Sequence, residues 1–485
     1  PVATNPIITS CRSSNPIENV FPNAAVPCMS LKNNTNVHNL IEGSVQRSLI
    51  RMTTPMIIGM LALFTFQLVD TWFISFLGTE SLTAISFTFP VTFTIMSLAI
   101  GMGIGASAVV AKALGKSQFE KAKEAASVIN YISLLLACLV VIVCWALMDD
   151  IFALMGANDR LMLPIREYMV VWFPGSVLIV CIMTSNSILR GYGDTKTPSI
   201  LMAAAAFSNA LLDPLLIFGI GPFPELGIQG AAWATVISWM LGFCYLFYLL
   251  VIKMELVSRS LPTQTTLKSS GLDMLRIGIP AAGANMMTPL AAGIMTAIAA
   301  GFGDSAVAAF GVGARIEPIA TLLVLAISSS LPPLISQNYG AGRFDRIEEA
   351  YRIATRFILV WQLLVYIVLA VSAGILATIF SEDPEVMEAI KLFVWIMPVG
   401  YGLQGIIILT NSSLNALHRP INALSLSIIR FFVFYVPLAY VGSLYFGLFG
   451  FFAGAVCSNL LMAMISWRAF NRALSGEQQL LEKTA

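Results

Sequence analysis

The chain has 485 residues, of which 57% are hydrophobic and only 11% are charged. Soluble domains carry roughly 25% charged residues, so this composition excludes an ordinary soluble enzyme, a disordered protein and a nucleic-acid binder. The 27 basic and 26 acidic residues leave a net charge of +1, which indicates no polyanionic partner. Long apolar blocks between about residues 49 and 472 instead predict a polytopic membrane protein.

Twelve apolar segments follow one another along the chain, and each is long enough to cross about 30 Å of hydrocarbon as a helix. They show no alternation with a period of two residues, so helices are expected and a barrel is not. Their expected limits are 50–77, 83–108, 126–148, 163–192, 198–220, 227–252, 273–301, 305–332, 353–380, 387–414, 421–443 and 446–470.

The sequence repeats itself at an interval of 225 residues, which later falls to 220. Six spans in each half give both halves the same orientation, so the chain is predicted to be an all-α integral membrane protein. Its twelve transmembrane helices form two pseudo-symmetric six-helix bundles, and two bundles that rock around a central cavity are typical of a transporter. The pairs that define the repeat are Pro55 and Pro280, Gly78 and Gly303, Gly115 and Gly340, Asn186 and Asn411, and the strings 227–230 and 447–450.

The expected organisation is a tail at 1–48, a six-helix bundle at 49–252, a cytoplasmic linker at 253–272, a second bundle at 273–472 and a cytoplasmic tail at 473–485. The first tail is rich in Asn, Pro and Ser and is expected to be disordered. We expect residues 1–28, which precede Met29, to lie upstream of the natural start, and a targeting segment is the alternative.

Basic residues predict the orientation of the spans, because they gather on the cytoplasmic side of membranes. With both termini cytoplasmic, 20 of the 27 basic residues fall on that side and three, Arg160, Arg166 and Lys391, fall on the outer side. The other four are Arg12 and Lys32 in the N-terminal tail and Arg315 and Arg430 within spans. The even number of spans and the cytoplasmic termini are therefore consistent with each other.

Two acidic residues lie inside predicted spans, where an ionised group is costly and therefore indicates a function. Asp70 lies about two turns before the outer end of span 1, and Asp213 lies at a similar distance before the outer end of span 5. Burial and a nearby second carboxylate both disfavour the charged form, so the pair could load and release a proton or share a sodium ion. The alternative is that each Asp only caps a kink or bonds a neighbouring helix.

Polar residues surround both acids. Asn209 precedes Asp213 by four residues and shares its helix face. Pro214 removes a backbone N–H group and predicts a kink in span 5 that frees a carbonyl near the carboxylate. The residues available for a proton or a sodium ion are Asp70, Asn209, Asp213 and Thr235, with Gln67 on the same side as Asp70.

The duplication provides a control for this interpretation. Met295 stands at the position equivalent to Asp70, and Ala455 stands at the position equivalent to Thr235. The stretch equivalent to Asp213, at 436–438, keeps a proline but has no acid. Both halves need these positions for the fold, yet only the first half has the acids, which favours a functional role for them.

Three more ionisable residues lie in spans of the second half: Arg315, Glu317 and Arg430. Arg315 and Glu317 are two residues apart and do not face each other on one helix. A structural ion pair to another helix is the favoured interpretation, and part of a substrate path or gate is the alternative.

Other motifs are weaker. The sequence at 101–105, Gly-Met-Gly-Ile-Gly, has no preceding strand and no following Lys, so it predicts close helix packing and not a phosphate loop. The stretch from Arg190 to Pro198 predicts a tight cytoplasmic turn. The seven cysteines show no spacing typical of disulfides or zinc, and no resident metal or cofactor is expected.

Several of these strings together resemble the multidrug and toxic compound extrusion (MATE) transporters, over almost all of 49–470. The resemblance implies a secondary active exporter and not an enzyme. Such an exporter moves cationic or amphiphilic organic compounds against inward proton or sodium flow by alternating access. The strings are Gln67-Leu-Val-Asp70-Thr, Phe76-Leu-Gly78, Asn186-Ser-Ile-Leu-Arg-Gly-Tyr-Gly-Asp-Thr-Lys-Thr-Pro198, Asn209-Ala-Leu-Leu-Asp213-Pro and Gly230-Ala-Ala-Trp-Ala-Thr235.

The chain is most similar to the DNA-damage-inducible-type branch of that family. The norfloxacin-exporter branch also relies on acids in spans 7 and 10, and this chain has none between 274 and 301 or after Glu388 in span 10. The resemblance also implies that Pro55 lets span 1 bend when Asp70 changes protonation. The implied coupling residues are Asp70, Asn186, Asn209, Asp213 and Thr235, with Tyr168 as a further member.

The expected setting is a bacterial inner membrane, in which the protein is a monomer that contacts the lipid bilayer and small substrates but no nucleic acid. A lipid-linked precursor flippase is an alternative, but it would favour a more cationic cavity than two arginines provide. A polytopic membrane enzyme is a third possibility, and no clustered catalytic residues support it.

Overall fold

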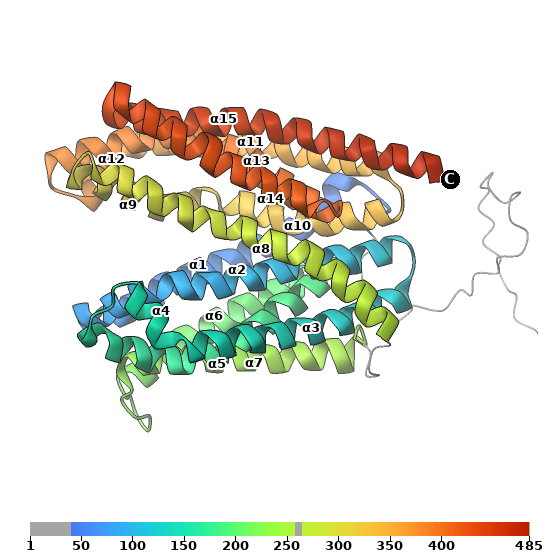
Figure 1. The fold of residues 1–485 in the computed structure, drawn as a ribbon, viewed down its shortest axis with the longest axis horizontal. Coiled ribbons are helices and arrows are strands. Elements are labelled where there is room, and N and C mark those ends of the chain that lie inside the picture. The colour runs from blue at the N-terminus through green and yellow to red at the C-terminus, as the bar shows by residue number, and fades with distance from the viewer. Residues whose placement is uncertain (1–39, 258–263, 485) are drawn as a thin grey trace, which may run out of the picture. The chain divides into compact units, whose positions relative to one another are not determined.

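A computed structural model describes residues 40–257 and 264–484, so most of the expected N-terminal tail lies outside the described residues. Every regular element in the described part of the chain is a helix. Figure 1 shows the helices of the first half of the chain gathered in one group and those of the second half in another. The prediction of an all-α membrane protein is confirmed.

The first half contains seven α-helices and one π-helix among the described residues. A short helix, α4, follows span 3 and was not predicted; its Asp149 forms an ion pair of 2.7 Å with Arg166 of α5. The elements are α1 (Val45–Ser75), α2 (Thr79–Gly115), α3 (Phe119–Ala146), α4 (Met148–Leu154), α5 (Asp159–Gly191), α6 (Lys196–Ile217), α7 (Gly227–Phe247) and the π-helix η1 (Tyr248–Lys253).

The second half repeats this plan with more interruptions. One span is broken between α9 and α10, another contains a 3₁₀ turn, and a third contains a π-helix. The elements are α8 (Gln264–Ala300), α9 (Asp304–Ala320), α10 (Leu322–Gly340), α11 (Phe344–Phe380), α12 (Pro384–Ile396), the 3₁₀-helix η2 (Met397–Gly400), α13 (Tyr401–Ala416), α14 (Pro420–Ile428), the π-helix η3 (Ile429–Tyr435) and α15 (Val436–Thr484).

The described residues contain ten helices long and apolar enough to cross a membrane, or eleven if the pair α9 and α10, bent by 47°, counts as one span. A further break lies inside α15, where Phe446 and Gly447 leave helical geometry. Gly442 and Gly450 on its two sides are in close backbone contact, so the chain reverses direction there. With this reversal, each of the twelve predicted spans coincides with helical structure.

The repeat predicted from the sequence is visible in the turns. Gly78 and Gly303 precede α2 and α9 with φ of +96° and +97°, a backbone conformation that residues with a Cβ atom rarely adopt. The stretch from Arg190 to Pro198 forms the predicted tight turn. There Asp194 accepts hydrogen bonds from the backbone nitrogen of Thr197 at 3.0 Å and from its hydroxyl at 2.6 Å, which fixes the start of α6.

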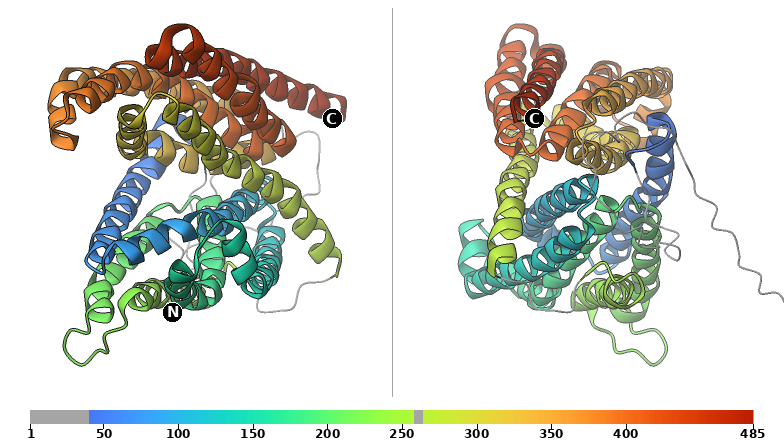
Figure 2. Two further views of the ribbon diagram at one scale, coloured as in Figure 1. Left: turned by 60° about the vertical axis from the view of Figure 1, so that its left-hand side comes forward. Right: turned by 90° about the vertical axis from the view of Figure 1, so that its right-hand side faces the viewer.

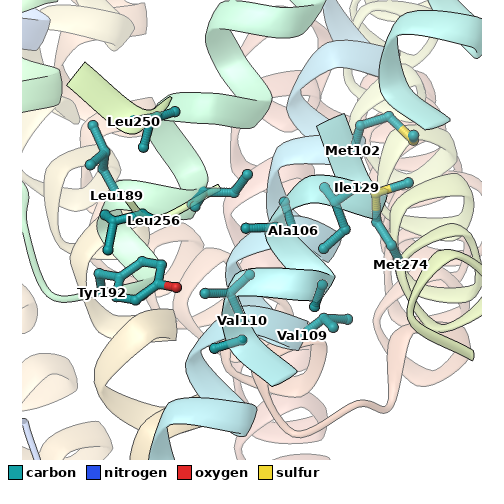
Figure 3. Close-up of a cluster of buried hydrophobic side chains, with 14 of the residues drawn as sticks. Met102, Ala106, Val109, Val110, Ile129, Leu189, Tyr192, Leu250, Leu256 and Met274 are labelled. Atoms are coloured by element: carbon teal, nitrogen blue, oxygen red, sulfur yellow. The ribbon is translucent and has the colours of Figure 1, made fainter. Parts of the chain in front are cut away.

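The N-terminal segments of α1 and α8 are exchanged between the two halves. Leu49 and Met52 of α1 are buried in a cluster formed by helices of the second half. Their repeat equivalents, Met274 and Ile277 of α8, are buried in a cluster formed by helices of the first half. Figure 3 shows Met274 beside Met102 and Ile129 in that cluster, and Figure 2 shows α1 and α8 each running between the two groups of helices.

Glycines allow the two halves to approach each other at backbone distance. A Cβ atom on Gly101 would lie 2.4 Å from the carbonyl oxygen of Gly278, and one on Gly105 would lie 2.6 Å from that of Met274. Gly103 faces the other way, toward Ser187 of α5. The prediction that this glycine run allows close helix packing is confirmed.

The helix ends meet in a second close contact at what we call the basic end, where Gly115, Gly191 and Gly340 lie. A Cβ atom on Gly115 would lie 2.0 Å from the carbonyl oxygen of Gln337, and one on Gly340 would lie 2.3 Å from that of Lys112. The two contacts are related by the 225-residue repeat. Gln337 also donates to the carbonyl of Gly191 at 2.9 Å, so this end of the molecule holds the halves together.

Residues 40–44, which precede α1, pack against the second half at the same end. The guanidinium of Arg346 donates to the carbonyl oxygens of Leu40 and Gly43, and Gln337 accepts from the backbone nitrogen of Leu40 at 3.1 Å. Leu40 and Val45 are buried. Packed structure is therefore present before the first predicted span.

We predict that Gly115→Ala and Gly340→Ala each lower the stability of the detergent-solubilised protein by about 1–3 kcal/mol, because the new methyl group meets a backbone carbonyl that must move. The apparent melting temperature measures the effect. Gly293→Ala in α8 is the control, since a Cβ atom there meets nothing within 4 Å and alanine favours the helix. Equal melting temperatures for all three variants would contradict the proposed contact.

Candidate functional site

The residues predicted for cation coupling come together between four helices of the first half. Asp70 lies on α1, Tyr168 on α5, Asn209 and Asp213 on α6, and Thr235 on α7. Tyr168 lies within electrostatic range of both carboxylates, and the two carboxylates lie within electrostatic range of each other. Five of the predicted residues therefore form one cluster.

A hydrogen-bond network links α6 to α7 through Asn209. With its amide nitrogen facing the carboxylate, Asn209 donates to Asp213 Oδ2 at 3.1 Å. Its amide oxygen then accepts from the hydroxyl of Thr235 at 3.1 Å and from the backbone nitrogen of Thr235 at 2.9 Å. The amide thus connects the Asp213 carboxyl group to the neighbouring helix.

Each carboxyl group keeps an unsatisfied oxygen. Asp213 has no exposed surface, and its Oδ1 atom has no hydrogen-bond partner among the described side chains. Oδ1 of Asp70 is likewise buried without a described partner. An ionised carboxylate buried in this way is costly, so both groups have a physical reason to take up a proton or a cation.

An apolar cluster lies next to the carboxylates, at the end of the helices away from the basic end. Ile74, Ile217 and Ala231 are buried there, and Phe73 and Phe218 pack against them with ring centres 6.3 Å apart. The ring of Tyr168 packs against the same cluster, so this residue contributes to the apolar wall as well as to the group of residues around the acids. The cluster separates the acids from that end of the molecule.

A cavity of about 70 Å³ lies on the other side of Asn209 and is lined by residues of α1, α5, α6 and α7. Asn186 and Ser238 line it together with Asn209 and Thr235. Oδ1 of Asn186 and Oγ of Ser238 are buried without a described partner, and a cavity of this size and polarity can hold water that bonds them. These four polar side chains form the polar part of a lining that is otherwise mostly apolar.

The structure places the remaining predicted residues at varied distances from this cluster. Asn186 lines the cavity. Pro55 lies in α1 three residues after Met52, where the helix leaves the second half. Pro214 lies in the last turn of α6, which ends at Ile217 and so does not continue beyond the expected kink. The side chain of Gln67 is outside the described residues.

Ser238 was not predicted as a site residue. It follows Thr235 by three residues and therefore shares its helix face. That spacing is the signal that could have found it, but a serine in an apolar helix is common and carries little information alone.

The equivalent region of the second half has become an apolar core. Met295 and Ala455, which stand where the first half has Asp70 and Thr235, are both buried in one cluster with Phe393, Phe451 and Phe452. The acids are thus not needed to build the bundle. Their presence in one half is a feature of the site and not of the fold.

Comparison with known proteins agrees with this architecture. The MatE family model matches twice, at residues 55–215 and 280–441, which together are more than half of the chain. The chain belongs to the MATE family of transporters. The two matches begin 225 residues apart, which confirms the internal duplication.

Relatives of the chain extend over most of its length. It is 41% identical over 431 residues to a protein of Shewanella oneidensis named "FAD transporter", covering 88% of this chain and 94% of the relative. It is 26% identical over 445 residues to "Probable multidrug resistance protein NorM" of Thermotoga maritima, covering 89% and 93%. The crystal structure of the Vibrio cholerae MATE transporter VcmN in the bent form matches with a TM-score of 0.86 and 33% identity, covering 90% of this chain and 98% of that one.

These findings make the chain a multi-pass MATE transporter and not an enzyme. They leave two kinds of substrate to consider, because one relative is named for a flavin dinucleotide and others are named for multidrug resistance or multidrug export.

We predict a coupling energy of about 0.5–1.5 kcal/mol between Asn209→Ala and Thr235→Val, because the two side chains share a buried hydrogen bond. Melting of the two single variants and the double variant in detergent measures it. The control pairs Asn209→Ala with Ser372→Ala, since Ser372 bonds only within α11 among the described residues. The network would be refuted if both pairs proved additive.

Proposed function

We propose that this MATE transporter is a proton-coupled antiporter whose coupling site is the cluster around Asp70 and Asp213. The observation that carries the proposal is the pair of buried carboxyl groups, each with an unsatisfied oxygen, in only one of two duplicated halves. Proton uptake at either group removes a buried charge. A proton can reach these carboxyl groups only while the site is open to the side of the membrane that supplies protons. Proton uptake is thereby tied to one orientation of the transporter, as alternating access requires.

The network around Asn209 supports a way to convert proton uptake into movement. The ionised Asp213 accepts from the amide of Asn209, which in turn accepts from Thr235 of α7. When Asp213 is protonated, its Oδ2 atom attracts the amide donor less strongly. The link between α6 and α7 then weakens, and α1 with Asp70 can shift relative to them.

A proton is favoured over sodium because one proton neutralises a buried carboxylate without the several oxygen ligands that a sodium ion needs. Sodium bound by Asp70, Asn209, Asp213 and Thr235 remains the second form of the proposal. The described residues hold no group of three or more His, Cys, Asp or Glu side chains arranged for a metal ion.

The proposed cargo is a flavin dinucleotide, exported from the cytoplasm. The support is the 41% identity to a relative named as an FAD transporter, compared with 24–27% for the relatives named for drug resistance or export. Cationic or amphiphilic drugs are the second candidate, and the acidic site in the first half favours them.

The remaining parts of the proposal concern setting and ancestry. We propose that both termini are cytoplasmic, as the basic residues indicate, and that the protein acts as a monomer in a bacterial inner membrane. Membership of the DNA-damage-inducible-type branch rests on the lack of acids in spans 7 and 10.

We predict that Asp70→Asn and Asp213→Asn each abolish FAD movement driven by an imposed proton gradient in proteoliposomes, because an amide cannot load and release the coupling proton. The measurement follows FAD fluorescence with proton and sodium gradients imposed one at a time. Asp304→Asn is the matched control, since Asp304 is an exposed carboxylate at the start of α9.

Wild-type transport by both site variants would refute the coupling site. Transport driven by a sodium gradient but not by a proton gradient would show that sodium, and not the proton, is the coupling ion. Proton-driven movement of an organic cation but not of FAD would keep the coupling site and exchange the cargo.

We predict that His418→Gln leaves the pH dependence of transport unchanged. His418 lies in the loop before α14 at the basic end, where burial and the nearby Lys112 lower the pKa of its imidazole to about 3. A lowered pKa keeps the ring neutral at every pH above that value, so it does not titrate in the range of about pH 5–8 in which histidines usually act. A shifted pH profile in this variant would assign part of the proton dependence to the basic end.

A further inference from the structure

The second half contains a buried polar cluster of its own, at the middle of its helices. Arg430 lies on the π-helix η3, Glu317 near the end of α9, Tyr401 and Gln404 at the start of α13, and Asn459 on α15. Arg430, Tyr401 and Asn459 are buried, with exposed fractions of 7%, 1% and 3%. Nothing in the coupling site described above involves these residues.

The cluster does not form the ion pair that the sequence favoured. Among the described residues, Arg315, Glu317 and Arg430 make no ion pair, and Arg315 is exposed on α9. Glu317 accepts from the amide of Gln404 at 2.7 Å instead. The expected structural ion pair is wrong, because the carboxylate and the guanidinium each take a neutral amide partner.

The guanidinium of Arg430 keeps unused hydrogen-bonding capacity. One of its terminal nitrogens donates to Asn459 Oδ1 at 3.3 Å, a long bond, and its Nε has no partner among the described residues. The hydroxyl of Tyr401 is also buried without a described partner. The N–H groups of a buried arginine normally all have hydrogen-bond acceptors. A buried guanidinium with an unpaired N–H group therefore indicates a binding position for an acceptor.

The backbone at Arg430 contains an insertion that the first half lacks. Pro198 and Pro420, which follow the turns after spans 4 and 10, are 222 residues apart, whereas Pro214 and Pro437 are 223 residues apart. The second half therefore holds one extra residue between its two prolines. The π-helix at 429–435 accommodates it, whereas the equivalent part of α6 is α-helical.

Such single-residue insertions distort a helix and occur frequently at functional sites. Here the insertion lies in the segment that carries Arg430. The position of this side chain therefore results from a local departure from the repeat and is not inherited from the fold.

We propose that Arg430 is the centre of an anion-binding subsite that holds a phosphate group of the exported substrate. The inference rests on the proposed export of a flavin dinucleotide and names the residues of the second half that recognise its phosphates. A guanidinium matches phosphate oxygens in geometry and charge, and the hydroxyl of Tyr401 adds a neutral donor.

Charge separation between the halves supports this assignment. The coupling site has two carboxyl groups, which repel a phosphate whenever they are ionised. A dinucleotide needs a cationic group elsewhere in the membrane-spanning region, and Arg430 is a buried cation with a free donor. Proton loading and anion binding then use different halves of one molecule, and the antiport cycle couples them through the change of orientation.

Glu317 keeps the empty subsite electrically balanced. It is near enough to Arg430 for their charges to interact, although the two form no ion pair. A phosphate can therefore reach the guanidinium without breaking a direct ion pair. Gln404 holds the carboxylate to one side through the 2.7 Å bond.

The test compares binding of FAD, FMN, riboflavin and inorganic pyrophosphate to the purified full-length protein by calorimetry. Arg430→Gln should weaken binding of FAD and pyrophosphate by about 10- to 100-fold, as expected for hydrogen bonds to charged groups, and leave riboflavin unchanged. Arg430→Lys should restore part of the loss because it keeps the charge. Tyr401→Phe, which keeps the ring volume, should lower FAD affinity by less, and Arg315→Gln is the control cation.

Equal FAD and pyrophosphate binding by wild type and Arg430→Gln would overturn the subsite and leave the proposed export intact. Loss of riboflavin binding together with FAD binding would also overturn it, because the arginine would then act on the fold. Pyrophosphate binding that depends on Arg430 without FAD transport would keep the subsite and reject the flavin cargo. If the wild type bound neither FAD nor pyrophosphate, the subsite and the flavin cargo would both fail, while proton-driven export of an organic cation would preserve the antiporter.

Discussion

The rest of the structure depends on the exchange of the N-terminal segments of α1 and α8 between the halves. Leu49 and Met52 are buried in the second half, and Met274 and Ile277 are buried in the first. Separation of the halves at the basic end would expose both sets, and each buried Leu, Ile or Met contributes about 1.5–3 kcal/mol. The glycine contacts between α2, α8 and α10 bring the backbones close enough for these side chains to reach their partners. Opening at this end must therefore bend or slide α1 and α8, because the halves cannot simply move away from each other as rigid bodies.

This exchange connects the coupling site to the second half. Asp70 lies 15 residues after Pro55 on α1, which is about 22 Å of helix at 1.5 Å per residue. One end of α1 thus lies beside Asn209 and Asp213, and the other end lies in the core of the second half. Pro55 lacks the N–H group that would stiffen the helix between them, so a shift at Asp70 can be absorbed there. A proton bound in one half can in this way alter the contact between both halves.

The sequence was sufficient for the spans, the duplication and the grouping of the polar residues around the two acids, because these follow from long apolar runs, from order along the chain and from the cost of buried acids. Asp70, Asn209, Asp213 and Thr235 could be grouped since helix spacing and the repeat restrict where they lie. The exchange of α1 and α8 could not be predicted, because an apolar turn is equally apolar against either half. The structural ion pair to another helix that was expected in the second half failed for a related reason. Charge alone does not reveal that Glu317 bonds Gln404 and that Arg430 bonds Asn459, so that neither charged group bonds the other.

Divergence of the two halves has a physical benefit for an antiporter. If both halves had kept paired acids, a phosphate-bearing substrate would meet repulsion throughout the membrane-spanning region. The first half instead keeps Asp213 with an unsatisfied oxygen, while the second half replaces the equivalent acids by an apolar core around Met295. That rigid core supports η3, in which one extra residue positions Arg430 where the first half has plain α-helix. Duplication therefore supplied two equal scaffolds, and the separation of acid from base between them allows proton and anion to be bound without competing for one site.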